Sequence, residues 1–139
     1  MKDIDFIFVY GTLKVGGFYA RHFDDYRLDN IEGYINGDLY DLRHFPALIL
    51  GGKNKVYGEI HKYNNFNSVI KLMDQIEGYR ENDIPDSLYI RKITKATARG
   101  RKILSKTVNV IVYEAGEIIK KELKNHKSEL KVQSGIWEI

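Results

Sequence analysis

The sequence predicts an α+β fold, in which a mixed, strongly curved β-sheet or small β-barrel is flanked by helices. Most of the predicted elements are strands, and one convincing helix interrupts them between residues 67 and 78. Gly33 and Gly37 recur on one face of the strand predicted over residues 31–39, where small residues allow strong curvature or close backbone approach. Many strands with few helices are typical of a curved sheet that carries its helices on the outside.

The N-terminal part is predicted to form a strand, a loop and a second strand. Residues 6–10 are a short apolar run, which predicts a buried strand. The run ends at Gly11, so the strand leads directly into a glycine-containing loop. Residues 18–26 are expected to form a short helix or turn. Side chains alternate between inward and outward types over residues 31–39, which predicts a strand with one buried face.

Four more strands are expected as two pairs, and each pair is expected to flank a turn. The last strand carries Val108, Val110 and Val112 on one face, which favours a half-buried hairpin. The expected strands cover residues 47–50 and 55–62, around a turn at 51–54, and residues 88–98 and 103–114, around a turn at 99–102.

The clearest helix runs from Asn67 to Gly78, because Asn is a good N-cap and Gly a good C-terminal stop. On a helical wheel at about 100° per residue, Glu77 is the one charged side chain inside the apolar arc. A carboxylate there must be paired, hydrogen-bonded or protonated, because burial of a bare charge is very costly. Burial would raise its pKa and suit it to general acid/base catalysis. The other members of the arc are Val69, Ile70, Leu72, Met73 and Ile76.

A structural interpretation of Glu77 stands beside the catalytic one. Glu77 lies one residue before the helix end, so its side chain could reach solvent or pair with Arg80 or Arg91. The wheel alone favours this structural interpretation over a catalytic role.

The chain of 139 residues is expected to form a single domain, residues 1–139. Residues after Ala115 predict a weak helix, and residues 135–137 are expected to dock back on the body of the domain. A chain of this length buries roughly 68% of the surface that the unfolded chain exposes, which is enough for a proper core.

Composition excludes several classes of function. The chain has no cysteine, which excludes disulfides, a thiol nucleophile and a cysteine metal site. No apolar run approaches the roughly 18 residues of a membrane span, and the N-terminus does not resemble a signal peptide. A cytoplasmic protein without a membrane partner is therefore expected. No metal or cofactor is expected either, because the histidines have no ligand spacing; they are His22, His44, His61 and His126.

The charge pattern does not favour a nucleic-acid partner. The net charge is only +3, and the cationic side chains concentrate around the turn at residues 99–106 and in the tail. Acidic residues are interspersed in the tail, which is typical of a solvated face. Proteins that bind nucleic acid usually show a stronger basic stripe or a recognisable module.

Several segments in the right order resemble the γ-glutamyl cyclotransferase-like superfamily. Residues 8–14, FVYGTLK, resemble the Tyr-Gly-Thr/Ser-Leu/Asn loop that opens these proteins, and residues 73–79, MDQIEGY, resemble the segment that carries the catalytic Glu. The branch resembled is that of the small bacterial and archaeal members and the γ-glutamylamine cyclotransferases. Residues 81–87 and 115–134 have no counterpart in the pattern. The remaining matches are residues 37–42, 45–47, 56–60, 89–91, 112–113 and 135–137.

The resemblance implies an α+β γ-glutamyl cyclotransferase-like fold and an enzyme, of lyase or acyltransferase type, that releases 5-oxoproline from a γ-glutamyl amine or γ-glutamyl amino acid without a cofactor. The α-amine of the substrate would attack its own γ-carbonyl, and Glu77 would act as general acid/base. The loop after the first strand would offer backbone N–H groups to the substrate carboxylate or the developing oxyanion. The implied substrate-binding residues are Tyr10, Gly11, Thr12, Leu13, Tyr89, Arg91 and Tyr113.

Other interpretations remain open at this point. Gly11 could serve only a tight turn, and aromatic strand residues are more often packing than pocket. A phosphate-binding loop is disfavoured, because Gly17 stands where the required Lys belongs. A non-catalytic member of the same fold, which binds a small metabolite, is the main alternative. The resemblance also leaves open the leaving group and the oligomeric state.

Overall fold

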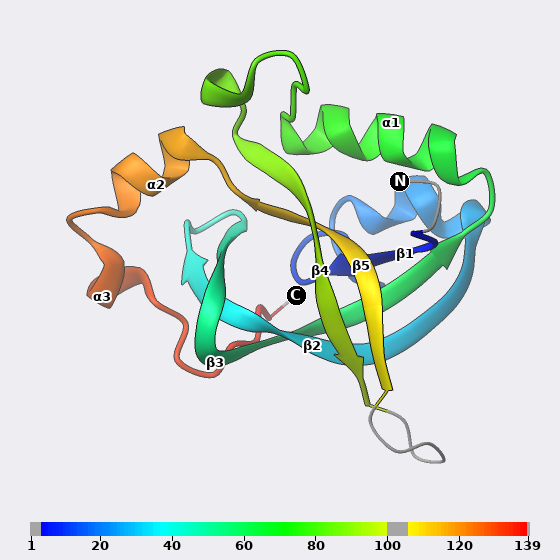
Figure 1. Ribbon diagram of the computed structural model, residues 1–139, viewed down its shortest axis with the longest axis horizontal. Coiled ribbons are helices and arrows are strands. Elements are labelled where there is room, and N and C mark those ends of the chain that lie inside the picture. The colour runs from blue at the N-terminus through cyan, green and yellow to red at the C-terminus, as the bar shows by residue number, and fades with distance from the viewer. Residues whose placement is uncertain (1–3, 100–105, 139) are drawn as a thin grey trace.

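Five strands close into a barrel in the computed structural model, which describes residues 4–99 and 106–138 (Figure 1). Their order around the barrel is β1-β3-β2-β4-β5. The β1–β5 pair is parallel and the other pairs are antiparallel, so the sheet is mixed, and the predicted fold class is confirmed. The strands are β1 (Phe6–Val9), β2 (Arg27–Asp41), β3 (Pro46–Tyr63), β4 (Tyr89–Ala98) and β5 (Lys106–Ala115).

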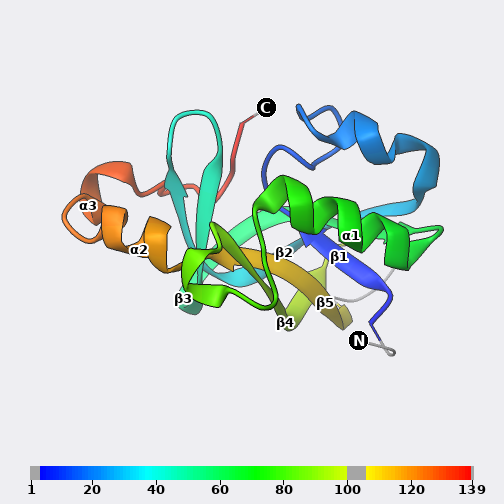
Figure 2. The ribbon, with the colours of Figure 1, turned by 90° about the horizontal axis from the view of Figure 1, so that it is seen from above.

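Helices cover the outside of this barrel. The longest, α1 (Phe66–Glu77), lies over β1 in both views of the ribbon (Figures 1 and 2). A 3₁₀ helix, η1 (Ala20–Tyr26), connects the loop after β1 to β2, and η2 (Ile84–Asp86) lies between α1 and β4. Two short helices, α2 (Glu117–Leu123) and α3 (Lys127–Leu130), lie at the opposite end of the molecule from η1 (Figure 2).

Two hydrophobic clusters follow from the alternation of side chains along the strands. Phe8 and Tyr10 belong to the cluster that also holds Val110 and Val112 of β5. Ile7 and Val9 belong to the other cluster, together with the buried face of α1. The strand β1 therefore packs one face against its fellow strands and the other against the helix that carries Glu77.

The two strands expected at residues 47–50 and 55–62 form one strand. The prediction that residues 51–54 are a turn between two separate strands is therefore wrong. Both stretches belong to β3, and both pair with β2, since Gly37 pairs with Leu50 and Asn36 with Lys55. The residues between them form a bulge. Gly51 and Gly52 have φ values of 106° and 81°, which a glycine adopts without strain, so the chain loops out and rejoins the same ladder.

The helix α1 differs from its prediction in where it begins and in how wide its buried face is. The N-cap is Asn65 rather than Asn67, because α1 begins at Phe66. Gly78 is the C-cap as predicted, with φ of 63°. Leu72 is 39% exposed, so the buried arc is narrower than the wheel suggested. It consists of Val69, Ile70 and Met73.

The C-terminal segment docks on the barrel as predicted. The Tyr57 N–H donates to the Gly135 carbonyl at 2.8 Å, and Trp137 packs against the cluster that holds Phe8 and Tyr10. The turn predicted at residues 99–102 lies, apart from Arg99, outside the described residues.

Candidate functional site

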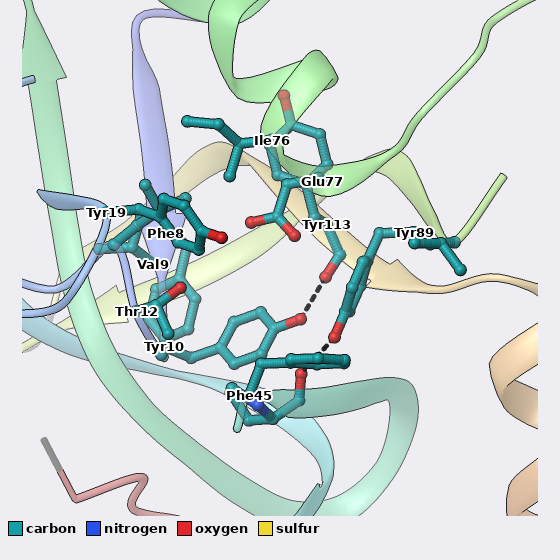
Figure 3. Close-up of a pocket in the computed structure, with 14 residues that line it drawn as sticks. Phe8, Val9, Tyr10, Thr12, Tyr19, Phe45, Ile76, Glu77, Tyr89 and Tyr113 are labelled. Carbon is teal, nitrogen blue, oxygen red and sulfur yellow. Dashed lines mark hydrogen bonds between the residues drawn. The ribbon is translucent and has the colours of Figure 1, made fainter. Parts of the chain in front are cut away.

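The loop after β1 and the C-terminal end of α1 line one cavity of about 260 Å³ (Figure 3). The structure therefore brings together the two segments that the sequence singled out, the loop from Tyr10 to Leu13 and Glu77. Tyr89 and Tyr113 line the same cavity. Arg91 is not among the described residues that line it.

The loop begins with a turn that leaves backbone donors free. The Lys14 N–H donates to the Gly11 carbonyl at 3.0 Å, which closes a turn over residues 11–14. Tyr19 N–H donates to the Thr12 carbonyl at 3.0 Å, so the loop is fixed at a second point. Within residues 4–99 and 106–138, no acceptor binds the N–H groups of Thr12 and Leu13. Free N–H groups beside a cavity are suited to an anionic oxygen.

Gly11 is required by packing rather than by a special φ. A Cβ atom at this position would lie 2.5 Å from the Cγ atom of Pro46. The loop can therefore approach the start of β3 only because this residue has no side chain. This close approach places the loop against one wall of the cavity, since Pro46 is also a lining residue.

Glu77 is the last residue of α1, and its carboxylate points into the space bordered by Tyr10, Tyr89 and Tyr113 (Figure 3). Burial raises the pKa of this carboxyl to about 7. The described part of the chain gives this carboxyl no hydrogen bond or ion pair that would lower its pKa again. The pairing with Arg80 or Arg91 that the structural interpretation offered is not found among these residues, because Arg80 pairs with Asp86 and Arg91 pairs with Asp74. The Glu77 residue as a whole keeps partial access to solvent.

The tyrosines that surround Glu77 direct their hydroxyl groups to acceptors of the protein. Tyr10 donates to the carbonyl of Tyr113, and Tyr89 donates to the carbonyl of Pro46 at 2.7 Å. The Tyr113 hydroxyl donates to Oδ1 of Asp74 at 2.7 Å. Burial raises the pKa of all three hydroxyls, so they are neutral. Their aromatic rings line the cavity, while their hydroxyl groups already donate to acceptors of the protein.

Arg91 lies in an ion pair next to the cavity wall. Its guanidinium lies 2.7 Å from Oδ2 of Asp74, the residue that also accepts from Tyr113. It also stacks over the ring of Tyr79, with 5.1 Å from the guanidinium carbon to the ring centroid. This geometry ties α1 to β4 and β5. Substrate binding by Arg91 stays a prediction from the sequence.

Several lining residues had no signal in the sequence. Tyr19 and Leu88 are aromatic or apolar and resemble ordinary core residues until the fold brings them together. Residues 8, 9, 45, 46 and 76 were part of the resemblance, but they had no role in the site assigned. The lining residues that were not predicted are Phe8, Val9, Tyr19, Phe45, Pro46, Ile76 and Leu88.

The electrostatics of the cavity are simple. Glu77 is the one acidic or basic side chain among the described residues that line it. The remaining polar groups include the Thr12 hydroxyl, the Tyr19 hydroxyl and the free N–H groups of the loop. An acid whose pKa lies near 7 can accept or donate a proton at neutral pH, so the cavity has the parts for general acid/base catalysis.

The described part of the chain contains no group of three or more His, Asp or Glu side chains placed to hold a metal ion. None of its helices is both long enough and apolar enough to span a bilayer.

Comparison with known proteins identifies a family and a shared fold. The model of the family described as "Gamma-glutamyl cyclotransferase, AIG2-like" matches residues 7–139. No curated protein matches the chain by sequence.

Solved structures share the fold at low sequence identity. An AIG2-like protein from Mus musculus is 22% identical, with a TM-score of 0.61, over 81% of this chain and 77% of the mouse protein. YkqA from Bacillus subtilis is 16% identical, with a TM-score of 0.61, over 96% of this chain but only 39% of its own length. An uncharacterized protein, PH0828, from Pyrococcus horikoshii is 14% identical, with a TM-score of 0.54, over 94% of this chain and 87% of that protein. At these identities the likeness shows the fold alone.

Proposed function

The chain belongs to the γ-glutamyl cyclotransferase, AIG2-like family, and on that premise we propose that it is an enzyme that releases 5-oxoproline from a γ-glutamyl amine or γ-glutamyl amino acid. The observation that carries the proposal is the carboxyl of Glu77, which has a pKa near 7 and faces a loop with free N–H groups in one cavity. An unpaired acid and an anion-binding loop are the two parts that this reaction needs on one substrate.

The reaction is an intramolecular acyl transfer. The α-amine nitrogen of the substrate attacks the γ-carbonyl carbon, so a carbon–nitrogen bond forms and closes a five-membered ring. The original amide bond then breaks, and the amine leaves. The attacking nitrogen loses two protons, one before the attack and one as the ring amide forms. Glu77 accepts each proton and passes it to the departing nitrogen, which leaves as an ammonium, so no net proton or water is consumed.

The loop would bind the α-carboxylate of the substrate. This group is a permanent anion, and no cationic side chain is found among the described lining residues. The N–H groups of Thr12 and Leu13, with the Thr12 hydroxyl, are therefore the donors best placed for it. Binding there would hold the substrate folded, with its amine close to its own γ-carbonyl, and proximity of this kind supplies much of the rate.

The rim of the cavity favours an uncharged leaving amine. Phe45 and Leu88, the more exposed lining residues, are 42% and 45% exposed, and Tyr19 and Ile76 are also accessible in part. A second carboxylate close to the amide would meet these apolar side chains without a counter-charge, which is unfavourable. Amines with an alkyl or aryl group next to the nitrogen are therefore expected to react faster than γ-glutamyl amino acids.

A panel of γ-glutamyl compounds tests the proposal. The panel holds alkyl, aryl, lysyl and α-amino acid leaving groups, and mass spectrometry measures the 5-oxoproline released. We expect turnover of at least one compound, unchanged by a chelator. Activity that a chelator abolished and a divalent ion restored would contradict the mechanism. Absence of turnover across the panel would favour a non-catalytic protein that binds a small metabolite.

A further inference from the structure

A group of polar side chains on β3 holds the cavity loop from outside the cavity. Glu59, His61 and Tyr63 alternate along β3, so their side chains lie on one face of that strand. None of these three residues is among the described residues that line the cavity. Glu59 pairs in register with Val9, the last residue of β1, directly before the loop begins.

The contact with the loop is a charge-assisted hydrogen bond. The Val15 N–H donates to Oε1 of Glu59 at 2.9 Å, and Nε2 of His61 lies 2.8 Å from the same oxygen. Val15 directly follows Lys14, whose N–H closes the turn over residues 11–14. The Glu59 carboxylate therefore fixes the end of the turn that carries the free N–H groups of Thr12 and Leu13.

His61 is held in the tautomer that suits this task. Its side chain is fully buried, and its Nδ1 accepts from Nε of Arg27 at 3.4 Å and lies 2.6 Å from the Tyr63 hydroxyl. A guanidinium can only donate, so Nδ1 is the acceptor and the ring proton is on Nε2, which faces Glu59. Burial lowers the pKa of His61, and the Arg27 charge acts in the same direction, against the opposing effect of Glu59.

Glu59 is ionised in this environment, unlike Glu77. Burial acts to raise the pKa of Glu59, but hydrogen bonds from His61 and Val15 outweigh it, and the pKa lies below its usual value. Arg27 is in turn fixed to η1, through Asp24 at 2.7 Å and the carbonyl of Ala20 at 3.3 Å. A continuous set of hydrogen bonds thus runs from η1 along β3 to the cavity loop.

We propose that Glu59, oriented by His61, is a positioning residue that holds the substrate-binding loop in its productive geometry. The proposal rests on the proposed function, in which the loop N–H groups bind the α-carboxylate of the substrate. Glu59 touches no reacting atom. Its loss frees Val15, lets the Thr12 and Leu13 N–H groups move away from the substrate, and weakens binding while the chemistry at Glu77 is retained.

Two variants of Glu59 and one matched control test this role. Glu59→Met keeps the length of the side chain but removes the acceptor, so we expect KM to rise about tenfold with kcat within about twofold. Glu59→Gln keeps an oxygen that can accept from Val15, so its KM is expected within about threefold of the parent. The control is Glu114→Met, because Glu114 also accepts a backbone N–H, that of Leu50 at 2.9 Å, yet does not bind the loop. Its KM is expected to match that of the parent.

Amide hydrogen exchange of Val15 provides a readout that is independent of turnover. Val15 is 44% exposed, so its N–H is protected from exchange only if Glu59 binds it. We expect protection in the parent and in Glu59→Gln, and loss of protection in Glu59→Met with core amides unchanged.

Three results would overturn the proposal. They are an unchanged KM in Glu59→Met, equal protection of Val15 in that variant and the parent, or the same kinetic loss in Glu114→Met. A parent protein without 5-oxoproline release would refute the proposed function instead, and the Val15 amide would still decide whether Glu59 holds the loop.

Discussion

At the scale of single residues, the environment of a side chain decides its chemistry. Glu59 and Glu77 have the same functional group, and both are partly buried. The Glu59 carboxylate receives two hydrogen bonds, and its pKa is lowered. The Glu77 carboxyl receives none from the described residues, and burial raises its pKa to about 7. Only the second can exchange a proton easily at neutral pH.

Glu77→Gln is expected to bind substrate and lose most of the turnover. Gln keeps the size of the side chain and one acceptor, but it can neither take nor return a proton. The loss in kcat should be roughly 10² to 10⁴, the usual range for general acid/base catalysis. Steady-state kinetics with the best substrate of the panel measures it. Turnover near that of the parent would show that Glu77 is an ordinary residue at a helix end.

The same variant should change how stability depends on pH. The folded pKa of Glu77, about 7, is above the unfolded value near 4.5, so the folded state holds this proton more tightly. Stability from this group is therefore complete below about pH 4.5 and is lost as pH rises through 7. Glu77→Gln lacks this loss, so its Tm should exceed that of the parent more at pH 8 than at pH 5. An equal difference at both pH values would contradict the raised pKa.

How far the sequence predicts individual site residues depends on where their partners lie. The helical wheel placed Glu77 on the buried face because its neighbours at helical spacing are apolar, a local property. The direction of the Tyr10 and Tyr113 hydroxyls could not be predicted in this way. Tyr10 binds a carbonyl that is 103 residues away in the chain, and Tyr113 binds Asp74 on α1. Such contacts exist only once the barrel has closed.

At the scale of elements, one carboxylate adds a polar tie to the apolar packing of α1. Asp74 accepts from Tyr113 of β5 and pairs with Arg91 of β4, so a single side chain joins the helix to two strands. Because Glu77 lies three residues further along the same helix, this junction also sets the position of the catalytic candidate. Asp74 was not among the members of the apolar arc on the wheel, and helical periodicity does not include partners on other elements.

Arg91→Met is expected to lower stability and leave substrate binding nearly unchanged. The Arg91 side chain is only 14% exposed, so its loss leaves Asp74 with one partner fewer in a poorly solvated place. The free energy of unfolding should fall by about 1–3 kcal/mol. KM should stay within about threefold, because Arg91 faces Asp74. Urea denaturation and steady-state kinetics measure the two quantities.

Arg80→Met is the matched control for the loss of the Arg91–Asp74 ion pair. Arg80 pairs with Asp86 at 3.5 Å, and both side chains are more than 60% exposed, at 66% and 63%. A surface pair of this kind contributes little, so stability should change by less than about 0.5 kcal/mol. A large rise in KM for Arg91→Met alone would instead support the prediction from sequence that Arg91 binds the substrate.

Element boundaries were predictable where the signal was local. Gly78 ends α1 because glycine adopts its positive φ without strain, and the sequence indicated this position. The sequence did not predict that β3 is a single strand with a bulge, because two glycines and polar neighbours are equally typical of a hairpin turn and of a bulge. Pairing of both halves of β3 with the long strand β2 decided between them.

At the scale of the whole molecule, the last residues of the chain support the first loop. The Lys14 ammonium donates to the carbonyl of Trp137 at 2.6 Å, and the Trp137 ring packs against the cluster that contains Tyr10. Lys14 belongs to the turn that follows Gly11. The cavity loop is therefore held at Val15 by Glu59 of β3 and at Lys14 by the C-terminal segment, two parts of the chain that the barrel brings to one place.

Truncation after Ser134 is therefore expected to weaken both stability and substrate binding. It removes the carbonyl that accepts from Lys14, the Gly135 carbonyl that accepts from Tyr57, and the apolar contact of Trp137. Loss of these contacts should lower Tm by about 5–15 °C, and KM should rise because the turn over residues 11–14 loses one of its supports. A chain that ends at Trp137 is the control, since it keeps all three contacts and its new carboxylate lies beside the Lys14 ammonium. This control should match the full chain in Tm and in KM. If the chain that ends at Ser134 kept the KM of the full chain, the C-terminal segment would stabilise the barrel without acting on the cavity loop.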